Sequence, residues 1–144
     1  MKRLSLFFGL LLLSSAETAG KGTIQVHIKG LRNNSGQVIL LLFEQPKGFP
    51  GDPYQAVAMQ RAEMEGDRAR ATFHGIPFGS YAISVLHDEN SNAKMDTTRI
   101  GLPKEGWGAS RNPKPRFRAP RFEEAKFAFS ASELLVEIDM LYLR

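Results

Sequence analysis

Short segments in which apolar and polar residues alternate recur along this chain of 144 residues, and such segments fit a β-sheet far better than a helix. In the first of them, Ile24, Val26 and Ile28 share one face and polar residues occupy the other, which is the period of a half-buried strand. Clusters of Gly, Pro, Asn and Asp separate the segments, and helical periodicity is scarce. We therefore predict an all-β domain, an antiparallel β-sandwich of about seven strands.

Strands are expected at residues 23–28, 37–43, 68–73, 81–86, 126–129 and 134–143. A turn cluster at residues 32–36 predicts that the first two strands form a hairpin, and the unbroken apolar run at residues 37–43 indicates burial on both faces. Three prolines and two glycines predict a loop at residues 45–53. Residues 54–65 fit neither a short helix nor a strand well.

The N-terminus has the layout of a secretory signal peptide. Lys2 and Arg3 precede a ten-residue apolar run at residues 4–13, and small residues follow it. Cleavage is expected after Ala16, and Ala19 is the second candidate, so the signal peptide covers residues 1–16 or extends to residue 19. We expect residues 20–144 to form a single β-sandwich domain.

A membrane span takes about 20 apolar residues, and no other long apolar run follows this one. The alternative reading of the run, a buried core helix, lacks caps and amphipathic flanks. We expect an exported protein, in the periplasm or outside the cell, with no transmembrane segment once the signal is removed.

The chain has no cysteine, which excludes disulfide frameworks, thiolate metal sites and thiol nucleophiles. An exported chain of this kind fits a bacterial periplasm, where a domain of this size can be stable through its core alone. Removal of residues 1–16 leaves 17 basic against 15 acidic residues, a formal charge of +2. This balance is too weak for a general nucleic-acid binder.

Residues 88–121 form a stretch of 34 residues with almost no strand pattern, which is too long for an idle connection in a compact domain. We expect the functional site here. Its first part carries oxygen-bearing side chains at loop positions 1, 3, 5 and 9, and position 7 offers its main-chain carbonyl. The candidate metal ligands are Asp88, Asn90, Asn92, Lys94 (through its carbonyl) and Asp96. This is the spacing of calcium loops, so calcium is the candidate cofactor.

Three features count against calcium. Position 6 is Ala93, where a glycine would adopt a positive φ without strain, and position 12 is Arg99, where an EF-hand has a bidentate carboxylate. Only two side-chain carboxylates would neutralise the cation. The alternative is an Asx-rich turn, in which the Asp and Asn side chains bind the loop's own backbone.

His87 next to Asp88 suggests a catalytic pair, but neighbours on a strand point to opposite faces. The nucleophile motif G-x-S-x-G is absent. A non-enzymatic role is favoured, and the alternative function is an envelope hydrolase or isomerase that uses His87 with Asp88 or Glu105.

Several unusual segments lie between residues 22 and 142: GL at 30–31, GQV at 36–38, GFP at 48–50, GSYA at 79–82, HDEN at 87–90, GLPKEGWG at 101–108 and FEEAKF at 122–127. They resemble the bacterial family catalogued as domain of unknown function 2141, which is known mainly for exported, uncharacterised single-domain proteins. Its G-x-Y-A…H-D-x-N-x-N core is similar to transthyretin-like and collagen-adhesin B-type sandwiches, some of which carry calcium loops.

This resemblance implies an immunoglobulin- or prealbumin-like sandwich and strengthens the expectation of a metal or binding role. The chain departs from the family pattern at Ala93, where glycine is usual, and at Ala109, where an aromatic residue is usual.

The second part of the stretch is rich in glycine and then in arginine. Trp107, the only tryptophan, predicts either an apolar platform for a ligand or a cover for the open end of the sandwich. Basic residues at 111, 114, 116, 118 and 121, interrupted by prolines, form an extended stripe suited to phosphates of lipopolysaccharide or anionic phospholipid, unless it is only a solvated loop. The candidate ligand-binding residues are His87, Glu105, Trp107, Arg111, Arg116 and Arg118. We expect an exported binding or accessory module of the cell envelope.

Overall fold

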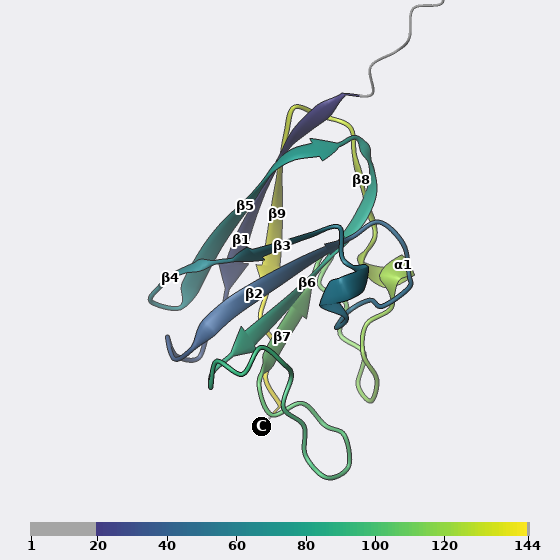
Figure 1. Ribbon diagram of the computed structural model, residues 1–144. Coiled ribbons are helices and arrows are strands. Elements are labelled where there is room, and N and C mark those ends of the chain that lie inside the picture. The colour runs from purple at the N-terminus through teal and green to yellow at the C-terminus, as the bar shows by residue number, and fades with distance from the viewer. Residues whose placement is uncertain (1–19, 144) are drawn as a thin grey trace, which may run out of the picture.

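The computed structural model describes residues 20–143, so the predicted signal peptide lies outside the described residues. Two sheets pack face to face (Figure 1). Sheet A contains, in spatial order, β4 (Glu63–Glu65), β5 (Arg68–Pro77), β1 (Lys21–Lys29) and β9 (Glu133–Asp139). Sheet B contains β3 (Ala58–Arg61), β2 (Gln37–Phe43), β6 (Gly79–Asp88) and β7 (Gly106–Ala109), and β8 (Phe127–Phe129) pairs with the start of β6. Two short helices, η1 (Pro53–Gln55) and α1 (Phe122–Ala125), complete the regular secondary structure of the described residues. The predicted β-sandwich is confirmed.

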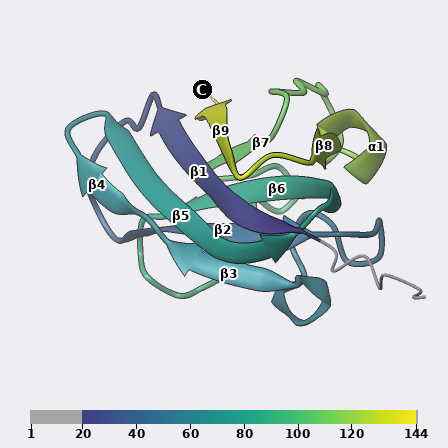
Figure 2. The ribbon, with the colours of Figure 1, turned by 90° about the horizontal axis from the view of Figure 1, so that it is seen from above.

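The core lies between the sheets, and the strand alternation places the apolar side chains there. Seen from above, β1 and β5 lie over β2 and β6 (Figure 2). The predicted inner faces of β1 and β6 are buried, including Ile24, Val26 and Ile28 of β1 and Tyr81, Ile83 and Val85 of β6. Strand β2 is buried on both faces, as its apolar run predicts: Leu40 packs in the core, and Leu41 packs outside it with Phe49 and Phe122.

The predicted hairpin between the first two strands is wrong, because β1 belongs to sheet A and β2 to sheet B. The turn cluster instead carries the chain from one layer to the other. Leu31 sits inside the core with 5% exposure, and its backbone N–H donates to the carbonyl of Asp67 at 2.9 Å. The two strands are therefore not hydrogen-bonded neighbours in one sheet. They lie in opposite sheets, and the inner face of each contributes apolar side chains to the shared core.

One pair of strands departs from the predicted antiparallel arrangement. β1 runs antiparallel to β5 but parallel to β9, with Ile24 opposite Leu134 and Ile28 opposite Ile138. The predicted faces of β9 are nevertheless correct, since Ile138 is buried and Glu137 is exposed. The first and last strands of the described residues are therefore neighbours.

The long stretch after β6 is not free of regular structure. Its residues 106–109 form β7, which pairs with β6 so that His87 lies opposite Gly106. Residues 89–105 consequently leave and rejoin sheet B at the same end. Residues 54–65, which the sequence leaves undecided, form η1 and then β3 and β4, which belong to different sheets.

Among residues 20–143, no helix has the length and apolar character needed to cross a membrane.

Candidate functional site

β6 ends at Asp88, whose fully buried carboxylate organises the turn that follows. Asp88 Oδ1 accepts a hydrogen bond from the backbone N–H of Asn92 at 3.1 Å, and Oδ2 accepts one from that of Ala93 at 2.8 Å. The side-chain amide of Gln37, on the neighbouring strand β2, donates to Oδ2 at 2.8 Å. These are the contacts of an Asx-rich turn, which the sequence leaves as one of two interpretations.

The side chains of Asn90, Asn92 and Asp96 meet further along the loop. Both amides donate to the Asp96 carboxylate, Asn92 at 2.8 and 3.1 Å. These hydrogen bonds, of which that from Asn92 contributes most, lower the pKa of Asp96 below its ordinary value. The backbone N–H of Lys94 donates to Asn92 Oδ1 at 3.1 Å, and the Lys94 side chain is exposed. The predicted metal ligands therefore share one loop, and its polar groups bind one another.

The fit of a calcium ion to this loop is mixed. Ala93 has a φ of 63°, which is the left-handed conformation that a calcium loop needs at position 6. Three donors, however, already point at the Asp88 carboxylate, and the amide N–H groups face Asp96. Within residues 20–143, no three His, Asp or Glu side chains are grouped as metal ligands.

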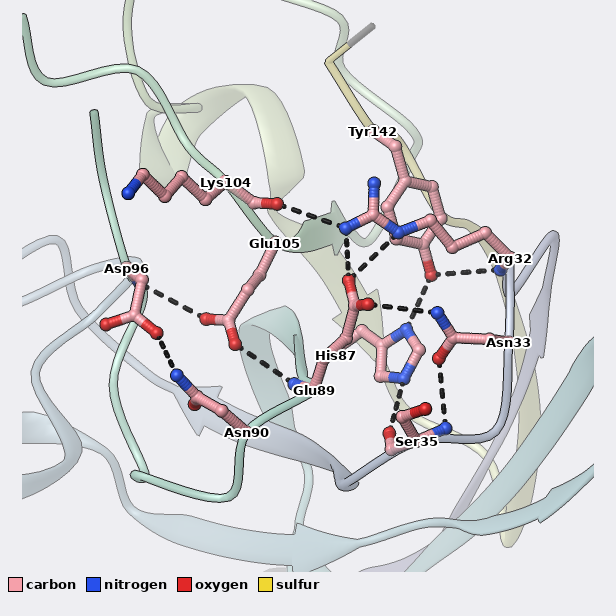
Figure 3. Close-up of polar contacts among 10 residues, drawn as sticks. All are labelled: Arg32, Asn33, Ser35, His87, Glu89, Asn90, Asp96, Lys104, Glu105 and Tyr142. Atoms are coloured by element: carbon pink, nitrogen blue, oxygen red, sulfur yellow. Dashed lines mark hydrogen bonds and ion pairs between the residues drawn. The ribbon is translucent and has the colours of Figure 1, made fainter.

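Glu105 fastens both ends of residues 89–96. Its side chain is buried, with 5% exposure, just before β7 begins. Oε1 accepts from the backbone N–H of Glu89 at 3.0 Å, and Oε2 accepts from that of Asp96 at 3.1 Å (Figure 3). Because each oxygen is used by the backbone, the geometry gives Glu105 a role in holding the loop.

His87 is fully buried at the end of β6. Its Nε2 lies 2.9 Å from the carbonyl oxygen of Ser35 and its Nδ1 lies 2.7 Å from the hydroxyl of Tyr142 (Figure 3). A carbonyl only accepts, so Nε2 carries a proton, and in the neutral ring Nδ1 accepts from the hydroxyl. Both nitrogens are thus engaged by groups other than Asp88 and Glu105, so the catalytic pair of the alternative function is not assembled.

Arg32 and Glu89 join the turn after β1 to the loop after β6. Arg32 Nε donates to Glu89 Oε1 at 2.9 Å, and Asn33 Nδ2 donates to Oε2 at 2.9 Å. Partial burial would raise the pKa of Glu89, but the hydrogen bonds from Asn33 and Arg32 outweigh it and the pKa is lowered. The Arg32 guanidinium also lies 4.7 Å from the ring centroid of Tyr142, a cation–π contact.

The glycines around Trp107 serve the packing of the sandwich. A Cβ at Gly106 would lie 2.3 Å from the Tyr142 ring, and one at Gly108 would lie 2.8 Å from Ile138 Cγ2. Trp107 itself is half-buried on β7 opposite Leu86, on the other face from these glycines. The two glycines therefore allow the segment from Ile138 to Tyr142 to pack closely against β7.

The candidate residues Arg111, Arg116 and Arg118 lie on a separate loop, residues 111–121, between β7 and α1. Arg111 Nη1 donates to the carbonyl of Lys126 at 3.3 Å, and Arg118 forms a two-pronged ion pair with Glu124 at 2.6 and 3.2 Å. Arg116 is exposed. The sequence places the candidate residues in one stretch, but β7 divides that stretch into two loops, and no hydrogen bond or ion pair among residues 20–143 joins the two loops.

Sequence reasoning missed Arg32, Glu89 and Tyr142 as members of the polar network around His87. Arg32 falls in a segment read only as a turn, and Tyr142 in a segment read only as a strand. The partners His87 and Tyr142 are 55 positions apart, so no local spacing announces their contact.

Comparison with known protein families gives a match over most of the chain. A family model described as "Uncharacterized protein conserved in bacteria (DUF2141)" matches residues 26–136. Comparison with curated proteins gives no significant match, and neither does comparison with solved structures.

Proposed function

We propose, from the premise that this chain belongs to the DUF2141 family, that it is an exported, non-enzymatic binding module of the bacterial cell envelope. Its loop 111–121 contacts an anionic envelope component, whose phosphates come from lipopolysaccharide or from anionic phospholipid. The observation that carries this proposal is a basic loop held in place at both ends.

The first end of the loop is fastened to the sandwich. Ser110, fully buried, donates its hydroxyl to the carbonyl of Ala125 at 2.6 Å and accepts from the N–H of Ile83 at 2.9 Å. Asn112 Oδ1 accepts from the N–H of Asp139 on β9 at 2.8 Å. This end of the loop is therefore tied to both sheets.

The second end is fastened to α1. Glu124 Oε1 accepts from the backbone N–H of Arg121 at 3.1 Å and also binds Arg118. The hydrogen bond from Arg118 contributes most to lowering the pKa of Glu124. Phe122 then enters the apolar cluster outside β2.

Most basic side chains of the loop have no acidic partner within residues 20–143, so their charge can bind an anion. Within residues 20–143, Arg118 has an acidic partner, whereas Lys114, Arg116 and Arg121 form no ion pair. Lys114 and Arg116 are exposed. Each cation near an anionic surface contributes about 1 kcal/mol, and the interaction is screened by salt.

Sedimentation with lipopolysaccharide and with vesicles of mixed phosphatidylglycerol and phosphatidylcholine tests the proposal. The double variant Lys114→Gln/Arg116→Gln should bind roughly 30-fold more weakly, which corresponds to about 2 kcal/mol. Lys29→Gln/Arg68→Gln removes the same charge from the outer face of sheet A and should bind as the wild type does. Equal losses in the two variants, or no binding by the wild type at low salt, would contradict the proposal.

A second candidate function, calcium binding by residues 88–96, has one specific observation in its favour. Ala93 adopts the left-handed conformation at loop position 6 although it lacks the freedom of glycine. Asp88, Asn90, Asn92, Lys94 (by its carbonyl) and Asp96 would be the ligands.

Thermal unfolding of the chain in chelator and then in millimolar calcium tests this second function. A ligand that binds only the folded state stabilises it by about 2.7 kcal/mol at a hundred times its dissociation constant. The rise in midpoint should be specific for calcium over magnesium and absent in Asp96→Asn. An unchanged midpoint would leave residues 88–96 as a structural turn.

A further inference from the structure

Phe117 lies at the middle of loop 111–121 with 90% of its side chain exposed. Its chain neighbours, Arg116 and Arg118, are also exposed. Scattered apolar residues on a surface are ordinary, but a phenyl ring that is almost entirely exposed and has an arginine on each side of it in the sequence is not. The ring gains nothing from the folded protein alone.

Prolines and an ion pair restrict the loop on both sides of this ring. Pro113 and Pro115 limit the backbone on one side of Phe117, and Pro120 is buried on the other. Arg118 donates to Glu124 through both terminal nitrogens of its guanidinium group, Nη1 and Nη2, which restrains the residue next to Phe117. Within residues 20–143, Phe117 takes part in no aromatic pair.

We infer that Phe117 inserts into the interfacial region of an anionic phospholipid bilayer while Lys114 and Arg116 bind the headgroup phosphates. This inference rests on the proposed function and narrows its partner to a lipid surface. An aromatic ring is favoured at the depth of the headgroups, and neighbouring cations are attracted to anionic lipids.

The chemistry of the loop tip separates a bilayer from other anionic partners. A soluble polyphosphate satisfies the cations but offers the phenyl ring no apolar medium. A protein partner needs an aromatic anchor surrounded by a broad contact patch, whereas here the neighbours of the ring are cations. Only a lipid surface uses both features of the loop, and one ring with a few cations gives reversible binding.

The test compares Phe117→Ala with Tyr54→Ala, a matched control because Tyr54 is an aromatic residue that is 94% exposed in η1. The probes are vesicles of phosphatidylglycerol and phosphatidylcholine, vesicles of phosphatidylcholine alone, and inorganic polyphosphate, which has no acyl chains. Both side chains are exposed, so both variants should fold, and circular dichroism checks this. Phe117→Ala should bind the anionic vesicles about tenfold more weakly with unchanged binding to polyphosphate, and Tyr54→Ala should match the wild type.

Insertion itself is measured with Phe117→Trp and lipids brominated in the acyl chain. The added fluorescence should be quenched beyond the quenching of Trp107 in the wild type. If Phe117→Ala binds anionic vesicles like the wild type, or the added tryptophan is not quenched, the insertion is overturned while the basic-loop function stands. If the wild type binds neither lipopolysaccharide nor anionic vesicles, the proposed function fails and this inference fails with it.

Discussion

Replacing Glu105 by glutamine tests whether one buried carboxylate holds the loop between β6 and β7. Glu105 accepts two backbone hydrogen bonds, at 3.0 Å from Glu89 and 3.1 Å from Asp96. A hydrogen bond to a charged group contributes about 1.5–3 kcal/mol. Glutamine keeps one acceptor oxygen but turns an N–H₂ group toward the other backbone N–H. Part of the loss is offset because a neutral amide costs less to bury than a carboxylate. We expect the free energy of unfolding to fall by about 2–3 kcal/mol.

Urea unfolding measures this change. With a denaturant slope of about 1–3 kcal/mol/M, the midpoint should fall by about 0.7–3 M at constant slope. Glu123→Gln is the matched control, because Glu123 is exposed and pairs only with Lys126, an interaction of about 0–1 kcal/mol. If Glu105→Gln shifts the midpoint no more than Glu123→Gln does, the two backbone hydrogen bonds do not stabilise the fold and the role assigned to Glu105 is wrong.

Three further predictions concern the surroundings of this loop. Gly106→Ala should destabilise the fold by about 1–3 kcal/mol, since its Cβ would overlap the Tyr142 ring, whereas Gly51→Ala, with nothing within 4 Å, should leave the urea midpoint nearly unchanged. Tyr142→Phe should lower stability by about 1–3 kcal/mol because it leaves Nδ1 of buried His87 without its partner, and an unaltered thermal midpoint would contradict that. The lowered pKa of Glu89 means that its carboxylate stabilises the fold above the ordinary pKa of a glutamate and that this stabilisation is lost as the pH falls through the lowered pKa. The stability difference between wild type and Glu89→Gln should therefore shrink on acidification, and a difference independent of pH would count against the Arg32 contacts as its cause.

Alternation predicts which face of a strand is buried, but it does not name the strand's neighbour. The inner faces of β1 and β9 follow directly from the sequence, yet their parallel pairing and the separation of β1 from β2 do not. β7 escapes detection for a related reason. Its inward positions, Gly106 and Gly108, have no side chain because Tyr142 and Ile138 fill that space, so no apolar pattern marks the strand.

In the candidate site, too, contacts between residues near in sequence are predictable and contacts between distant residues are not. The turn from Asp88 to Asp96 is built by contacts between residues a few positions apart, and the spacing of Asp and Asn predicts it. Glu105 is identified as a site residue by its charge, but its bonds to the loop backbone depend on the pairing of β6 with β7. The Arg32–Glu89 contact joins positions 57 apart and has no local signature.

The parallel pairing of β1 with β9 also bears on how the chain reaches its fold. Each residue of β1 finds its β9 partner 110 positions later, as in Thr23 with Glu133. Contacts between such distant positions form slowly, because the loop they close is long. While β9 is still being synthesised, β1 has β5 on one side and an unpaired edge on the other. The sandwich can therefore close only once β9 is available, so a growing chain remains incompletely folded until that strand emerges. For a protein exported as proposed, this delay would keep the polypeptide unfolded enough to pass through a narrow translocation channel.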